Sequence, residues 1–142
     1  MSIWKVDTDL QRINARHANT IVELLDIRVT EIGEDFITAS MPVDHKTHQP
    51  RGILHGGASV LLAESIGSLA ANMALTPGFF AVGLDINANH IKSVKAGLVF
   101  ATATPIHIGR STHVWHIQIK DQSDRLICIA RLTMAVLPGE SK

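Results

Sequence analysis

The most regular feature of the chain is a long apolar run near its middle. Residues 57–75 are rich in Ala and Leu, contain no Pro, and stop just before Thr76-Pro77-Gly78. This pattern predicts one long helix, since strong helix formers are followed directly by residues that end helices. Because the run is apolar on nearly every side, the helix must be enclosed by other parts of the protein.

Shorter periodic segments precede this run. Asp7 or Thr8 can cap the first of them, and two β-rich runs on either side of Ile32-Gly33-Glu34-Asp35 predict a hairpin with a short loop. The predicted elements are helices at residues 9–17 and 20–25, strands at 27–30 and 36–43, and a polar segment at 44–54.

Four β-rich runs follow the long helix. Short turn-like sequences separate them, which predicts antiparallel neighbours. In the third run, Trp115, Ile117 and Ile119 alternate with polar residues, so one face of the sheet is expected to be buried. About six strands around one helix make an α+β domain. The four runs are residues 80–92, 98–108, 112–120 and 126–137.

No linker, repeat or low-complexity tract interrupts this pattern, so residues 1–142 are predicted to form a single domain. One curved sheet can cover only part of the helix. We therefore expect a second copy of the chain to cover the rest, and the protein to be a homo-oligomer.

Composition narrows the classes of function. Thirteen Lys and Arg balance thirteen Asp and Glu, so the chain has no net field to attract nucleic acid or an acidic membrane surface. A single cysteine, Cys128, excludes an intrachain disulfide and suits a reducing compartment. The start of the chain lacks a signal-like apolar segment, and the long apolar run is interrupted before it could span a membrane. The expectation is a cytoplasmic protein without membrane or nucleic-acid partners.

The sharpest local motif is the segment from Gln49 to Gly57, QPRGILHGG, which runs straight into the long helix. A helix N-terminus presents unpaired N–H groups and the positive end of the helix dipole, and glycines let a ligand approach the backbone closely. The segment is therefore a candidate oxyanion site. The structural alternative is that His55 only caps the helix and that Gly56 and Gly57 ease a tight junction.

Glu64 is the only charged residue between Gly52 and Leu84. Burying an unpaired carboxylate is costly, so its presence suggests a nucleophile or a general base. The alternative is a structural carboxylate that a polar neighbour or a subunit interface satisfies. Ser68 lies four residues further along the same helical face and could hold a water beside Glu64, or simply permit close packing.

Helix length decides how these groups can combine. At ~1.5 Å per residue, Gly56 and Glu64 are about 12 Å apart along one helix, whereas one reacting carbon needs both groups within ~3.5 Å. A single chain cannot supply both. Two antiparallel helices about 8–10 Å apart across a twofold axis could bring the N-terminus of one beside Glu64 of the other.

Other candidates are weaker. His45 and His48 form an HxxH pair without a clear third ligand, so no metal site is predicted. The glycines match no nucleotide-binding fingerprint. The turn Gly109-Arg110-Ser111 could grip a phosphate or be a solvated hairpin turn. The polar residues from Asn87 through Asn89 to His90 could form a binding mouth or a strand end.

These motifs together resemble one known family. HGGASVLLAESIGSLA, preceded by MPVDHKTHQP and followed by VGLDINANH and PIHIGRS, closely resembles the hotdog-fold acyl-CoA thioesterases over nearly the whole chain. Within that family the chain is most similar to the 1,4-dihydroxy-2-naphthoyl-CoA thioesterases of menaquinone synthesis and their neighbours, the enterobactin proofreading thioesterases. The resemblance implies a hotdog fold, a dimer of dimers, and hydrolysis of acyl-CoA or aryl-CoA thioesters without a metal or other cofactor.

The resemblance also implies roles for individual residues. Glu64 would attack the thioester or activate water, and Ser68 would position that water. Gly56 would offer its N–H to the thioester oxygen, with His55 and Gln49 orienting the thioester from the other subunit. The substrate-binding positions that it implies are Gly83, Asn89, His90, Gly109, Arg110 and Ser111.

One position departs from the family pattern. Arg51 stands where close relatives tend to carry an aromatic residue, so the acyl pocket could differ or the cation could contact a phosphate. Two other functions stay open at this point. A hydratase or dehydratase on the same scaffold would need a His and an acid on either side of the acyl chain, and a non-catalytic acyl-CoA sensor would use the pocket for binding alone.

Overall fold

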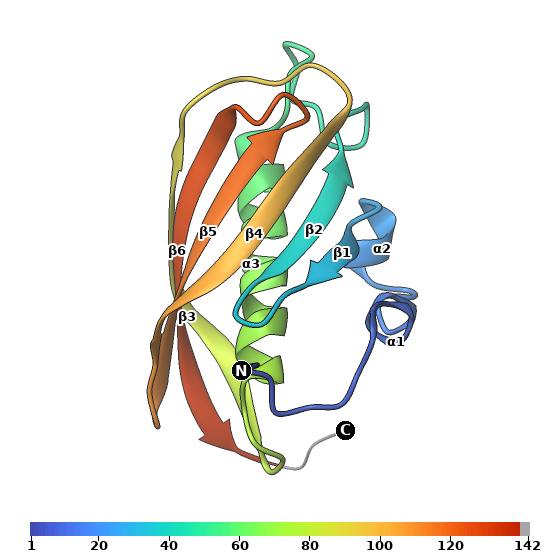
Figure 1. Ribbon diagram of the computed structural model, residues 1–142. Helices are drawn as coiled ribbons and strands as arrows, with labels where there is room; N and C mark the ends of the chain where they lie inside the picture. The colour runs from blue at the N-terminus through green and yellow to red at the C-terminus, as the bar shows by residue number, and fades with distance from the viewer. Residues whose placement is uncertain (140–142) are drawn as a thin grey trace.

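The chain forms an antiparallel six-stranded sheet that curves around one long helix, and the computed structural model describes residues 1–139 (Figure 1). This confirms the predicted α+β architecture with a wrapped central helix. The strand order is β1-β2-β4-β5-β6-β3. The elements are α1 (Leu10–Ala15), α2 (Ile21–Leu24), β1 (Arg28–Ile32), β2 (Ile37–Pro42), α3 (Gly56–Met73), β3 (Phe79–His90), β4 (Leu98–Ile108), β5 (Thr112–Asp121) and β6 (Leu126–Pro138).

Helix α3 packs on the concave face of the sheet and makes the core with it. The inward residues Trp115, Ile117 and Ile119 of β5 are fully buried, which confirms the predicted alternation. Helix and sheet approach each other closely at Gly67, where an added Cβ would lie 2.7 Å from the side chain of Leu132. A residue larger than glycine there would force the two layers apart.

One expected neighbour relation is wrong. The short link between β3 and β4 suggested that these strands pair, but β3 pairs with β6 instead, with Ala88 opposite Ala130. The link crosses over the end of the sheet (Figure 1). Backbone hydrogen bonds hold it there, from Ile91 N–H to the Ile127 carbonyl (2.7 Å) and from Val43 N–H to the Gly97 carbonyl (2.8 Å). These bonds supply the pairing that a β3–β4 hairpin would have given.

As a result, β3 is an edge strand. Phe79, Phe80, Val82 and Leu84 on this strand are exposed, Leu84 by 62%. A long apolar edge with unpaired backbone groups is a ready template for another strand.

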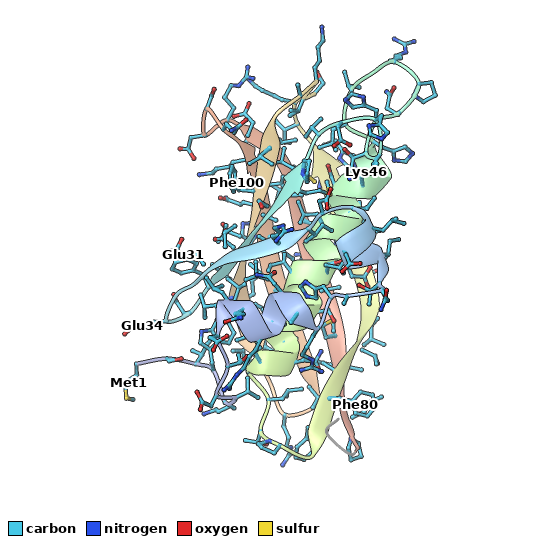
Figure 2. The ribbon with its side chains drawn as sticks, turned by 90° about the vertical axis from the view of Figure 1, so that its right-hand side faces the viewer. Met1, Glu31, Glu34, Lys46, Phe80 and Phe100 are labelled. Carbon is cyan, nitrogen blue, oxygen red and sulfur yellow. The ribbon has the colours of Figure 1, made fainter. Side chains whose placement is uncertain are left out.

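The N-terminal segment covers the side of α3 that faces away from the sheet (Figure 2). Trp4 stacks on Trp115 with ring centroids 6.2 Å apart, and its Nε1–H donates to the Gly33 carbonyl at 2.7 Å. The N-cap of α1 is Asp9, whose carboxylate accepts from Arg12 N–H, so the predicted cap at Asp7 or Thr8 is wrong. Asp9 can do this because its backbone is extended and the helix begins directly after it.

No helix among residues 1–139 combines the length and apolarity that a membrane crossing would require.

Candidate active site

The start of α3 has the geometry of an anion-binding helix terminus. A tight turn precedes it, in which Gly52 N–H donates to the Gln49 carbonyl at 2.9 Å. His55 is the N-cap, and its Nδ1 accepts a hydrogen bond from Gly57 N–H at 2.8 Å. Among residues 1–139 the N–H of Gly56 has no acceptor. His55 therefore caps the helix, as the alternative interpretation of this motif predicted. The backbone N–H of Gly56 is still free to donate a hydrogen bond to a ligand.

A cavity of about 330 Å³ opens beside this terminus and brings three predicted residues together. Gln49, Gly56 and His90 all line it, together with Lys92. The His90 ring lies so close that a Cβ on Gly56 would be 2.9 Å from its Nε2. A larger residue at position 56 would displace the ring from this position. The side-chain oxygen of Gln49 accepts from the backbone N–H of Arg51 within its own turn.

Glu64 lies two helical turns further along, half-buried against the edge strand β3. Within residues 1–139 its carboxylate takes part in no ion pair or hydrogen bond, whereas Asp121, another acid of low exposure, is paired with Arg125 at 2.8 Å. A Cβ on Gly83 would lie 2.6 Å from Glu64 Oε2. The ladder of β3 is irregular between Gly83 and Asp85, so a β-bulge lies beside the carboxylate.

Ser68 follows one turn after Glu64, and Asn72 one turn after Ser68. Asn72 ties α3 to β3, because its Oδ1 accepts from Ala81 N–H at 2.9 Å and its Nδ2 donates to the Ser68 carbonyl at 2.9 Å. The sequence analysis missed Asn72. The available signal was a polar residue continuing the Glu64 and Ser68 face of an otherwise apolar helix.

The remaining candidates lie apart from these two groups. The turn Gly109–Ser111 is at the opposite end of the sheet from His90, since Thr112 pairs with Ala135 and His90 with Cys128. Asn89 is exposed on β3 and is not among the residues that line the cavity. One chain therefore keeps Gln49 and Gly56 separate from Glu64 and Ser68, as the helix-length argument requires.

Metal-ligating clusters are absent from residues 1–139. His48, half of the HxxH pair, uses its Nε2 to bond the Lys95 carbonyl at 2.8 Å. A buried histidine on β5, His113, was not predicted as a special residue. Its Nδ1 accepts from Trp115 Nε1–H at 3.2 Å, and its Nε2 is buried without a partner in the described residues.

Comparison with known proteins places the chain in a family. The profile of the thioesterase superfamily matches residues 51–128. The crystal structure of a thioesterase from Haemophilus influenzae superposes with a TM-score of 0.95 at 49% identity, covering 96% of this chain and 95% of that one. The 1,4-dihydroxy-2-naphthoyl-CoA hydrolase of Escherichia coli is 48% identical, covering 95% of this chain and 99% of its own. A proofreading thioesterase of Cronobacter turicensis is 44% identical, with coverages of 95% and 98%. The chain therefore belongs to the thioesterase superfamily and is a thioester hydrolase of the hotdog fold.

Proposed function

We propose that the protein hydrolyses acyl-CoA or aryl-CoA thioesters at sites shared between two copies of the chain. Glu64 and Ser68 of one copy face Gln49, His55 and Gly56 of the other. The observation that carries this proposal is the half-buried Glu64 carboxylate, which has no ion pair among residues 1–139 and lies against the exposed edge strand β3. A structural carboxylate in that position would be expected to have a partner.

The assembly follows from β3. Two copies joined edge to edge along this strand would cover Val82 and Leu84 and extend the sheet antiparallel across a twofold axis. The same axis would place the two α3 helices antiparallel, with the N-terminus of each near Glu64 of the other. This arrangement brings together the N-terminus of α3 and Glu64, which are about 12 Å apart along the helix of a single chain. We further propose that two such dimers associate into a tetramer.

The reaction needs no group beyond these residues and water. The Gly56 N–H and the positive end of α3 stabilise the negative charge that develops on the thioester oxygen. Glu64 either takes a proton from water as it attacks the carbonyl carbon, or attacks the carbon itself to form an anhydride that water then opens. In both routes the C–S bond breaks, the thiolate leaves as CoA and takes up a proton, and the acyl group leaves as a carboxylic acid.

Substrate contacts outside the reacting carbon are assigned to the remaining polar residues. His90 lies against Gly56 in the 330 Å³ cavity, where it can border the thioester. The exposed guanidinium of Arg110, with Gly109 and Ser111 in the same turn, suits a phosphate of CoA. Gly83 and Asn89 complete the proposed binding strand. The similarity to the Escherichia coli hydrolase supports a 1,4-dihydroxy-2-naphthoyl substrate, and with it a cytoplasmic role in menaquinone synthesis.

The decisive experiment measures thiol release from a panel of benzoyl-, naphthoyl- and straight-chain acyl-CoAs by wild type and by Glu64→Gln. Because Gln keeps the shape but loses the basic and nucleophilic oxygen, we expect kcat to fall by at least ~100-fold. Circular dichroism and native mass measurement serve as the control for folding and assembly. Near-normal turnover by Glu64→Gln would contradict the role of this carboxylate.

Crotonyl-CoA distinguishes hydrolysis from hydration, because hydration removes the enoyl absorbance without releasing thiol. Ligand binding without either reaction would identify a sensor.

A further inference from the structure

The side chain of Asn72 binds both backbone groups of one residue on the edge strand β3. Its Oδ1 accepts from Ala81 N–H at 2.9 Å, and its Nδ2 donates to the Ala81 carbonyl at 3.3 Å. Among residues 1–139 these are the only hydrogen bonds between α3 and β3. Hydrogen bonds are directional, so Asn72 fixes both the position and the orientation of Ala81 relative to the helix.

The two backbone groups that Asn72 binds point away from the sheet. Ala81 lies opposite Val136 of β6, and the N–H of Val136 donates to the Ser111 carbonyl at 2.9 Å instead of to Ala81. Ala81 and Val136 are therefore a non-hydrogen-bonded pair of the antiparallel ladder. At this point of the open edge, the amide of Asn72 takes the place that a neighbouring strand would occupy.

Ala81 lies two residues before Gly83, where β3 meets the Glu64 carboxylate. A Cβ on Gly83 would be 2.6 Å from Glu64 Oε2. The pairing of β3 with β6 is irregular between Gly83 and Asp85, and a bulge disrupts the ladder locally. Since β6 holds this part of the strand less firmly, its position depends more on the fixed residue beside it, which is Ala81.

Asn72 is too far from Glu64 to act on it directly. The two residues are eight positions apart on α3, about 12 Å along the axis at ~1.5 Å per residue. Both belong to one continuous helix, so any movement of β3 relative to α3 changes the distance between Gly83 and the carboxylate. The hydrogen bonds from Asn72 to Ala81 oppose that movement.

We propose that Asn72 is a positioning residue for hydrolysis, and that it keeps the backbone of Gly83 against the Glu64 carboxylate by binding Ala81. This assignment rests on the proposed role of Glu64. The Nδ2 of Asn72 also donates to the Ser68 carbonyl at 2.9 Å, so the turn of α3 that carries Ser68 is joined to the same point of the strand.

The test measures kcat and KM of Asn72→Leu with acetyl-CoA, benzoyl-CoA and octanoyl-CoA. We expect kcat to fall by about tenfold or more, because a small displacement of a reacting group is enough to slow the reaction by this factor. KM should stay within about twofold, since the thioester contacts at Gly56 are unchanged. The decrease in kcat should be the same for the three acyl groups, because it arises at the carboxylate.

A loss of stability alone is tested by Ile27→Ala. Ile27 is buried between α2 and β1 and belongs to neither α3 nor β3, and its truncation should destabilise the fold at least as much as the loss of Asn72. We expect this variant to keep the wild-type kcat. All assays are made at a temperature where circular dichroism shows each variant to be folded, and native mass measurement verifies assembly.

Asn72→Asp provides a second readout, which depends on pH. The ionised carboxylate can accept from Ala81 N–H but cannot donate to the carbonyls of Ala81 and Ser68, whereas the protonated carboxyl group can do both, like the amide. The ratio of kcat in Asn72→Asp to kcat in wild type should therefore rise at least about threefold from about pH 8 to pH 5. The same ratio for Asn72→Leu should not change with pH.

Three results would overturn the inference. One is a kcat of Asn72→Leu that equals wild type or that Ile27→Ala reproduces. Another is a ratio for Asn72→Asp that does not change with pH. The third is a KM that rises with the length of the acyl group, because Asn72 also lines a cavity of about 540 Å³ and would then contact the substrate directly.

The ¹³C resonance of the Glu64 carboxyl group, assigned with Glu64→Gln, tests the positioning without turnover. We expect it to shift in Asn72→Leu and to stay unchanged in Ile27→Ala. If wild type releases no thiol from any substrate and the resonance shifts in this way, the positioning of the carboxylate is retained and the proposed hydrolysis is refuted. An unshifted resonance in Asn72→Leu would refute the positioning, whether or not wild type releases thiol.

Discussion

At the scale of single residues, the position of the Glu64 carboxylate depends on the absence of a side chain at Gly83. The space that a side chain at position 83 would occupy contains the Glu64 carboxylate, with only 2.6 Å between Oε2 and an added Cβ. Glycine on this edge strand weakens the strand, so its presence there points to the neighbouring carboxylate rather than to sheet stability.

We predict that Gly83→Ala reduces kcat by about 100-fold, because even a displacement of ~1 Å in a reacting group has an effect of that size. The free energy of unfolding should change little, since Gly83 is exposed on β3. Thiol release and urea unfolding measure the two quantities separately. Val82→Ala, on the same strand, controls for a general effect on β3. Wild-type turnover by Gly83→Ala would mean that the observed position of Glu64 is not needed.

His113 should make stability depend on pH. Burial, and to a lesser degree the nearby His107, lower the pKa of His113. Protonation would also place a hydrogen on Nδ1, the atom that accepts from Trp115. The folded protein therefore keeps this ring neutral at pH values where the unfolded chain, with an ordinary pKa of about 6.5, takes up a proton. The stabilisation is fully present above that pKa and is lost as the pH falls below it.

We predict that the free energy of unfolding decreases between about pH 7 and pH 5, and that His113→Gln flattens this decrease. Gln at this position can still accept from the indole but does not titrate. Burial and the Arg16 charge lower the pKa of His17 as well, so some slope should remain. Urea titrations at several pH values provide the measurement, with His116→Gln on the opposite face of β5 as the control. An unchanged slope in His113→Gln would contradict the assignment.

At the scale of elements, Asn72 fixes the second half of α3 on β3. It accepts from the Ala81 N–H and donates to the carbonyls of Ala81 and Ser68. We predict that Asn72→Leu lowers the free energy of unfolding by about 1–3 kcal/mol, since the backbone groups of Ala81 lose their partners. Asn87→Leu, an exposed site on the same strand, should change it by less than about 0.5 kcal/mol. Equal changes in the free energy of unfolding for the two variants, measured with urea, would show that the hydrogen bonds of Asn72 do not stabilise the fold.

The elements themselves could be predicted from the sequence because each ends at residues with a clear local preference. Pro77 and Gly78 follow α3, and the alternation around Trp115 identifies β5 and its buried face. Strand order could not be predicted in this way. The position of β3 at the edge depends on where the link after it makes its hydrogen bonds, and that is a property of the folded chain.

The candidate site was also predictable only in part from the sequence. Helix spacing predicted that Glu64 and Gly56 act from different chains, and the structure keeps them apart. Asn72 gave a weaker signal, because a polar residue on an apolar helix does not show which strand it will contact. The folded chain is needed to bring its side chain to the backbone of Ala81.

At the scale of the whole molecule, the proposed activity belongs to a pair of chains, and two inactive variants should restore it together. Glu64→Ala lacks the carboxylate and Gln49→Ala lacks the orienting amide, and each damages every site of its own homodimer. If subunits exchange freely in an equal mixture, half of the dimers are mixed. One of the two sites in each mixed dimer combines Glu64 of one chain with Gln49 of the other, so about a quarter of all sites are intact.

We therefore predict that the mixture regains about a quarter of the wild-type thiol release per chain. A mixture of Glu64→Ala with Glu64→Gln is the matched control, because no pairing of these two chains restores the carboxylate and no recovery is expected. Native mass measurement of chains with different tags verifies exchange. If mixed dimers form and remain inactive, Glu64 and Gln49 act from the same chain or not in one reaction. The exposed edge of β3 would then need another explanation, since joining two copies along it would complete no site.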